Sequence, residues 1–151
     1  MISLPDLFLD ACVFIAAAAS SQGASALVMD LCKRGKTRPV ATQLTLREAE
    51  RNIRLRFKQE VLLHFYQDIA DARLWLIEPA EPHEIEACSR MIAPKDAHVL
   101  AAAIRSNAGI LLTLDRKHFM TPSVRQAKTG LAVQTPGDFL RQWVDGTDRL
   151  A

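Results

Sequence analysis

The chain has 151 residues, of which 49% are hydrophobic and 24% charged, and its net charge is +2 at pH 7. This composition excludes a disordered chain, and the length predicts a single domain over residues 1–151. The three cysteines (Cys12, Cys32 and Cys88) form no CxxC pair, which argues against a disulfide framework or zinc site and is typical of a reducing compartment. No apolar run is long enough to cross a membrane, so we expect a soluble, cytoplasmic protein.

The first half of the chain alternates short apolar runs with amphipathic stretches. Ser20 to Gly23 interrupts the helical pattern, and Gly35 is placed to end the next helix, because glycine is favoured just after helix C-termini. Residues 45–57 carry apolar side chains three or four positions apart, which is the spacing of one helix face. In chain order, we predict a strand over 7–9, helices over 12–19 and 24–34, a strand over 38–41, helices over 45–57 and 60–70, and a strand over 74–77.

In the second half, prolines open three predicted helices, because proline is favoured in the first helical turn. The first of these helices carries apolar residues through Met91, and the second ends at Asn107 to Gly109. The most strand-like run of the chain follows directly and is bounded by Asp115. The predicted elements are helices beginning at Pro82, Pro94 and Pro136, and strands over 110–114 and 131–133.

Short, continuous apolar strands that alternate with helices are typical of a parallel sheet covered on both faces. We therefore predict an α/β fold, a single three-layer domain with a central, mostly parallel sheet flanked by helices. Such sheets bind ligands beyond the carboxyl ends of their strands, where the strand order reverses. Asp10 and Asp115 each follow a predicted strand, so we expect both at that edge.

Each candidate acid also has a purely structural explanation. Asp10 suits the N-cap of the helix after it, Asp96 lies in a first helical turn where the dipole favours an anion, and Asp115 suits a turn. Glu48 suits an exposed helix surface. Taken together, however, two acids follow strands and two lie near the starts of helices that must face the same sheet. Four carboxylates at one edge repel one another, and a hard ion such as Mg²⁺ or Mn²⁺ neutralises them.

Four segments, in this order, resemble the PIN-domain nuclease family: LFLDACVFI, VATQLTLREAERNI, PKDAHVLAAAI and ILLTLDRKHF. A closing TPGDFLRQW resembles the last helix of bacterial members of the toxin type, so the resemblance runs from about Phe8 to Trp143. The resemblance implies a PIN-like fold. It also implies Mg²⁺- or Mn²⁺-dependent hydrolysis of RNA phosphodiester bonds, with products that carry 5′-phosphate and 3′-hydroxyl ends.

Carried over to this sequence, the family pattern assigns a four-acid site and one supporting hydroxyl residue. Glu48 is preferred to Glu50 for the second acid, because Glu50 points about 200° away on a helical wheel. The acids assigned to both catalysis and metal binding are Asp10, Glu48, Asp96 and Asp115, and the supporting residue is Thr113.

Two departures from the family pattern affect this site. Many members carry Asn or a hydroxyl residue just after the first acid, whereas Ala11 and Cys12 stand here. We therefore expect the polar support of Asp10 to come from elsewhere, from Thr42 or Thr113. Some members also carry a fifth acid shortly after the fourth, where this chain has Lys117-His118.

Basic residues are concentrated between Lys33 and Lys58, where nine stand against two acids, a local balance of +7. Such a segment attracts phosphate, although a solvated helix surface is at least as common an explanation for one charge run. Two histidines lie near the acids in the sequence: His98 follows Asp96 by two positions, and His118 lies just past Asp115. His118 is the better candidate for contacting substrate. The residues expected to contact RNA are Arg51, Arg54, Lys58, Arg116, Lys117 and His118.

From its size and the family resemblance, we expect the toxin of a type II toxin–antitoxin pair. This implies an RNA substrate, a cognate antitoxin as partner and a homodimer. The main alternative is a catalytically inactive PIN-like module that binds RNA or a protein. A phosphatase-type phosphoryl-transfer enzyme fits less well, because such enzymes place a second Asp where this chain has Cys12.

Overall fold

Five short strands form one sheet within residues 4–148, the part of the chain that this computed structural model describes. The strands are β1 (Leu7–Leu9), β2 (Pro39–Thr42), β3 (Trp75–Ile77), β4 (Ile110–Leu112) and β5 (Ala132–Gln134). All their pairings are parallel, and the strand order is β3-β2-β1-β4-β5. The order therefore reverses between β1 and β4, which is where ligands bind in open α/β sheets.

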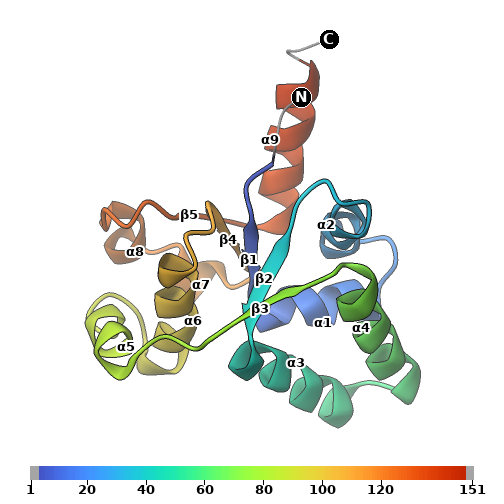
Figure 1. The fold of residues 1–151 in the computed structure, drawn as a ribbon, viewed down its shortest axis with the longest axis horizontal. Coiled ribbons are helices and arrows are strands. Elements are labelled where there is room, and N and C mark those ends of the chain that lie inside the picture. The colour runs from blue at the N-terminus through green and yellow to red at the C-terminus, as the bar shows by residue number, and fades with distance from the viewer. Residues whose placement is uncertain (1–3, 149–151) are drawn as a thin grey trace.

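Helices cover both faces of the sheet (Figure 1). One face packs against α1 (Ala11–Ala19), α2 (Ala24–Lys33), α3 (Gln43–Arg56), α4 (Gln59–Asp71) and α9 (Pro136–Asp148). The other packs against α5 (Pro82–Cys88), α6 (Pro94–Arg105), α7 (Arg116–Phe119) and α8 (Pro122–Gln126). The three-layer α/β fold predicted from the sequence is confirmed.

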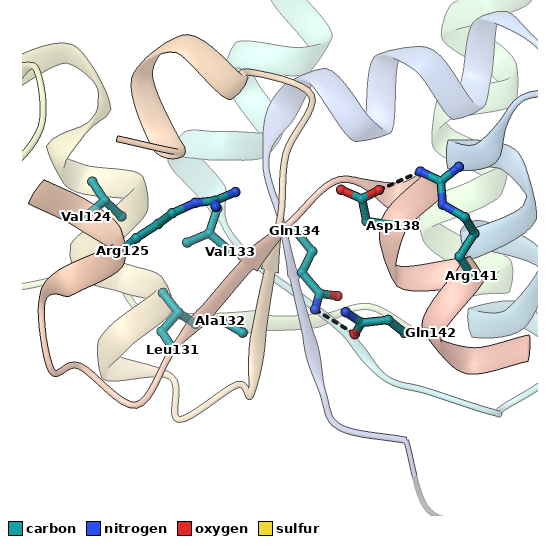
Figure 2. A pocket seen from close by; sticks show the side chains of 9 residues that line it. All are labelled: Val124, Arg125, Leu131, Ala132, Val133, Gln134, Asp138, Arg141 and Gln142. Atoms are coloured by element: carbon teal, nitrogen blue, oxygen red, sulfur yellow. Dashed lines mark hydrogen bonds and ion pairs between the residues drawn. The ribbon is translucent and has the colours of Figure 1, made fainter. Parts of the chain in front are cut away.

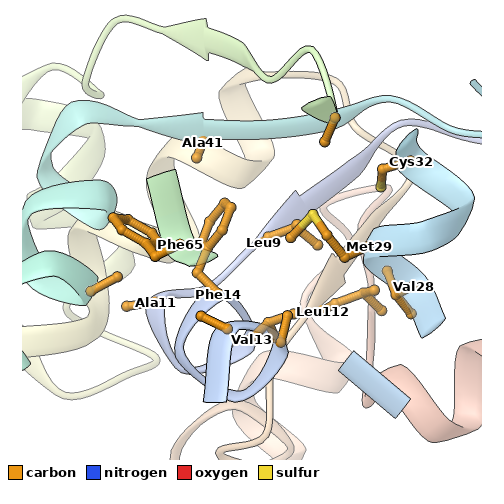
Figure 3. Close-up of a cluster of buried hydrophobic side chains, with 14 of the residues drawn as sticks. Leu9, Ala11, Val13, Phe14, Val28, Met29, Cys32, Ala41, Phe65 and Leu112 are labelled. Carbon is orange, nitrogen blue, oxygen red and sulfur yellow. The ribbon is translucent and has the colours of Figure 1, made fainter. Parts of the chain in front are cut away.

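Strand β1 contributes to both hydrophobic cores, because successive side chains of a strand point to opposite faces. Leu7 and Leu9 lie in the core beneath α1 to α4, whereas Phe8 lies in the core beneath α5 and α6. In the first core, shown in Figure 3, the ring of Phe14 packs edge-on against Phe65 with centroids 6.1 Å apart. Full burial of side chains of this size contributes roughly 1.5–3 kcal/mol each. This packing fixes α1, and with it the position of Asp10, against the sheet.

Strand β4 is shorter than predicted and ends at Leu112 instead of Leu114. The backbone N–H of Thr113 still donates to the carbonyl of Gln134, at 3.0 Å. The N–H of Leu114, however, donates to the Cys12 thiol at 3.3 Å, so the chain leaves the sheet here. A contact between residues a hundred positions apart therefore ends the strand, and local propensity could not predict it.

Other differences from the predicted elements are local. The predicted helix at Pro82 ends at Cys88, which leaves Met91 outside it. The short helices α7 and α8 were not predicted. Each begins at a side-chain cap, Asp115 for α7 and Thr121 for α8, and each is too short to show an apolar periodicity.

No single helix among residues 4–148 is long and apolar enough to cross a membrane. Helices α1 and α2 reach the required length and composition only together, and they are bent by 95° at the break between them. Both helices contribute buried side chains to the first core.

Candidate functional site

Asp10 lies at the carboxyl end of β1 and is only 8% exposed. Its Oδ1 accepts a hydrogen bond from the backbone N–H of Ala11 at 2.8 Å, which caps α1. Its Oδ2 accepts one from the hydroxyl of Thr113 at 2.8 Å. Of the two threonines considered as support for Asp10, Thr113 makes this contact, whereas Thr42 caps α3 by accepting from the N–H of Thr45.

Cys12 belongs to the same hydrogen-bond network, which the sequence did not indicate. Its sulfur lies 3.6 Å from Asp10 Oδ2 and 3.6 Å from Thr113 Oγ1, and it accepts the N–H of Leu114. Burial raises the pKa of the Cys12 thiol to about 11. The sulfur is therefore protonated at neutral pH and acts as a weak hydrogen-bond donor instead of a nucleophile.

Asp115 follows β4 and connects to Asp10 through Thr113. Its backbone N–H donates to Thr113 Oγ1 at 3.0 Å. Its Oδ1 accepts the N–H of His118 at 3.1 Å and so caps α7, and its Oδ2 lies 2.8 Å from Nδ1 of the His118 ring. A single hydroxyl thus joins the ends of β1 and β4, at the point where the strand order reverses.

Glu48 on α3 and Asp96 in the first turn of α6 complete the acidic group. Burial raises the pKa of Asp10, and the negative charge of Asp96 also raises it. The hydrogen bonds from Thr113 and Ala11 lower this pKa and oppose the other two effects. Burial also raises the pKa of Glu48, with additional contributions from the charges of Asp10 and Asp96. Side chains from separate segments of the chain therefore act on one another electrostatically.

These residues fit a hard divalent cation. The Oδ2 atom of Asp96 is buried and has no hydrogen-bond partner among the described residues. Such a group costs about 1–3 kcal/mol when left unpaired, and a cation would supply its partner. One oxygen of Asp96, one of Asp115 and a ring nitrogen of His118 lie within 4.8 Å of one another, close enough to share an ion.

The four acids line a single cleft of about 560 Å³. Three polar or basic residues that the sequence analysis did not select also line it: Asn52, Arg56 and Lys95. Two of them could have been found, because Glu48, Asn52 and Arg56 follow one another at intervals of four and so share a helix face. Glu50 lies outside this lining and accepts a hydrogen bond from Tyr66 at 2.6 Å.

The residues predicted to contact RNA lie in different surroundings. Arg54 forms an ion pair with Glu50 and donates to Tyr66, and Arg116 lies 3.7 Å from Asp138. The charge of Arg51 lowers the pKa of Glu48, and His118 contacts Asp115. The two remaining residues, Lys58 and Lys117, are exposed.

A second hollow, of about 480 Å³, lies along β5 and between α8 and α9 (Figure 2). Its polar side chains are mostly paired with one another: Gln134 donates to Gln142 at 2.8 Å, and Arg141 donates to Asp138. The hydrogen bond from Arg141 lowers the pKa of Asp138, the one carboxylate among the described residues of its lining. This hollow therefore lacks the group of unneutralised acids that distinguishes the cleft.

Comparisons with known proteins identify the family of this chain and agree with its fold. The chain matches the family model of the PIN domain over residues 6–117, a stretch that contains all four acids. It is similar to the crystal structure of PAE2754 from Pyrobaculum aerophilum, with a TM-score of 0.60 and 19% identity over 91% of this chain and 88% of that one. No curated protein matches the chain. Because the family model covers most of its length, the chain belongs to the PIN-domain family.

Proposed function

We propose that this protein is a Mg²⁺- or Mn²⁺-dependent ribonuclease that hydrolyses phosphodiester bonds. PIN domains are generally nucleases, which supports the reaction class. The observation that carries the proposal is the gathering of four carboxylates from four segments in one cleft, with a buried Asp96 oxygen left unpartnered among the described residues. Asp10 and Asp115 also cap helices, but capping does not require four like charges to share one cleft, where they repel one another.

In this proposal the acids hold the cation and the neighbouring groups hold the acids. When bound, the ion supplies an activated water and stabilises negative charge on the phosphate. Thr113 and Cys12 orient the carboxylate of Asp10 through their hydrogen bonds. The ligands proposed for the ion are Asp10, Glu48, Asp96 and Asp115.

The basic residues of the cleft are proposed to bind the RNA backbone. Arg56 and Lys95 line the cleft itself and are the nearest candidates for phosphate contacts. Arg54 and Arg116 are paired with acids in exposed positions, and such surface pairs are weak, so phosphate can replace the acid. The remaining proposed contacts are Arg51, Lys58 and Lys117.

The proposed activity is tested by incubating the purified protein with a structured RNA and Mn²⁺. We expect cleavage that EDTA abolishes and added Mn²⁺ restores, with 5′-phosphate ends on the products. A preparation of Asp115→Asn, purified in parallel, controls for contaminating ribonuclease. Binding of RNA without any metal-dependent cleavage would contradict the proposal and favour a PIN-like binding module instead.

We further propose that the protein is the toxin of a type II toxin–antitoxin pair, acts in the cytoplasm and forms a homodimer. The size of the chain and its family membership support this role. The cysteines at positions 12, 32 and 88 are all free thiols, which agrees with a reducing compartment. A short reading frame directly upstream that encodes a DNA-binding antitoxin is the genomic observation expected from this proposal.

A further inference from the structure

His118 lies against the acidic group, three positions after Asp115. Its ring Nδ1 is 3.0 Å from Oδ1 and 2.8 Å from Oδ2 of Asp115. The backbone N–H of His118 donates to the same carboxylate. Both the backbone and the ring of His118 therefore contact Asp115 within one short helical turn.

The same ring lies close to the unpartnered acid. Among the described residues, Asp96, Asp115 and His118 form the group of possible ligands whose atoms all lie within 4.8 Å of one another. Both oxygens of Asp10 already accept hydrogen bonds, whereas the buried Oδ2 of Asp96 accepts none from the described part of the chain. The closest set of potential ligands is thus two carboxylates and one imidazole, not carboxylates alone.

We propose that His118 is a nitrogen ligand of the divalent ion, so that the site prefers Mn²⁺ to Mg²⁺. This inference rests on the metal site of the proposed function and specifies its ligands. Neighbouring ligands of an octahedral ion with bonds of about 2.1 Å stand about 3 Å apart. The separation of 2.8 Å between Nδ1 and Oδ2 is that of a hydrogen bond, and an ion that replaced its proton would bind both atoms at nearly the same spacing.

The types of ligand atom determine which metal ion the site prefers. Mg²⁺ favours oxygen ligands and retains its waters, whereas Mn²⁺ comes nearer to the transition ions that accept imidazole. A neutral imidazole offers one lone pair. When Nδ1 carries that lone pair, the ring proton lies on Nε2, which has no hydrogen-bond partner in the described part of the chain.

A simpler role for His118 is to orient Asp115 by donating from Nδ1, without contacting the ion. The two roles differ in whether nitrogen is bonded to the metal, and this can be measured directly. The test is pulsed electron paramagnetic resonance of Mn²⁺ bound to the full chain without RNA. Three proteins are compared: the wild type, His118→Asn and His98→Asn.

His98→Asn is the matched control, because His98 is also a histidine near the acids. Its charge lowers the pKa of Glu48. In His118→Asn the new side-chain amide can still donate to Asp115, so the cap of α7 is expected to survive. Thermal denaturation checks that both variants fold. In the wild type and in His98→Asn, we expect the electron spin echo of bound Mn²⁺ to be modulated by a coordinated nitrogen. In His118→Asn, we expect this modulation to be lost.

Equilibrium titrations provide a second readout. The dissociation constant for Mn²⁺ is expected to rise about tenfold or more in His118→Asn, and that for Mg²⁺ to rise less. Bound Mn²⁺ without nitrogen modulation in the wild type would overturn the role of His118 and leave the metal site intact. Modulation that persists in His118→Asn would overturn it as well. Failure of the wild type to bind Mn²⁺ at all would instead refute the proposed function.

Discussion

Asp10→Asn is expected to lower the rate of Mn²⁺-dependent RNA cleavage by more than about 100-fold. Losing even an outer partner of a metal ligand commonly costs about 10–100-fold, and Asp10 is proposed to contact the ion itself. The substitution removes the charge and preserves the shape. The amide oxygen of Asn can still accept from the N–H of Ala11, and Asn is a favourable N-cap, so α1 is expected to remain in place.

The measurement is the initial rate of cleavage at saturating Mn²⁺, together with the melting temperature of the variant. Asp30→Asn is the matched control, because Asp30 is an exposed acid on α2 outside the cleft lining. We expect its rate to stay within about twofold of the wild type, as is usual for surface substitutions that disturb no packing or pairing. Equal rates for Asp10→Asn and Asp30→Asn would contradict the assignment of Asp10.

Mn²⁺ is expected to stabilise the wild-type protein strongly, and more so as the pH rises. At about 100 times the dissociation constant, a ligand of the native state contributes about 2.7 kcal/mol. For a chain of this size that raises the melting temperature by roughly 5–10 °C. The gain arises because the ion replaces the mutual repulsion of the acids with attraction.

The direction of the pH dependence follows from the raised pKa values of Asp10 and Glu48. An acid whose pKa is higher in the folded state binds its proton more tightly there than in the unfolded chain. The contribution of Asp10 and Glu48 to the stability of the metal-free protein should therefore fall as the pH rises from about 4 towards their folded pKa values. With excess Mn²⁺ the trend should reverse, because the ion binds the ionised carboxylates.

Glu48→Gln and Glu50→Gln form a matched pair for this prediction, since both change one carboxylate of α3. In EDTA, Glu48→Gln should flatten the fall in melting temperature with pH, because it removes one of the acids in the cleft. Glu50→Gln should keep the wild-type slope, since Glu50 contacts Tyr66 and Arg54 instead. Identical slopes for the two variants would show that Glu48 does not belong to the coupled group.

The sequence was most informative where function depends on the ends of strands. Asp10 and Asp115 follow apolar runs, and the parallel sheet places both runs side by side. Helical geometry also separated Glu48, which lines the cleft, from Glu50, which does not. These features follow from local periodicity and from the general rule that ligands bind where the strand order reverses.

The parts of the site that were missed depend on contacts between distant segments. The thiol of Cys12 bridges to Thr113 and Leu114, and no local pattern predicts a hydrogen bond across a hundred residues. The proximity of His118 to Asp96 depends on the path of the chain between β4 and α7, which is set by the Asp115 cap. Arg56, by contrast, was predictable from its spacing to Glu48.

Anomalous diffraction from crystals soaked in Mn²⁺ tests most directly whether carboxylates from β1, α3, α6 and the β4–α7 connection hold one cation. The data should be collected on the wild type without RNA, at a wavelength where manganese scatters anomalously. We predict a manganese peak inside the cleft, within bonding distance of carboxylate oxygens of Asp10, Glu48, Asp96 and Asp115. A saturated crystal with no peak in the cleft, or with manganese bound only elsewhere, would contradict the account.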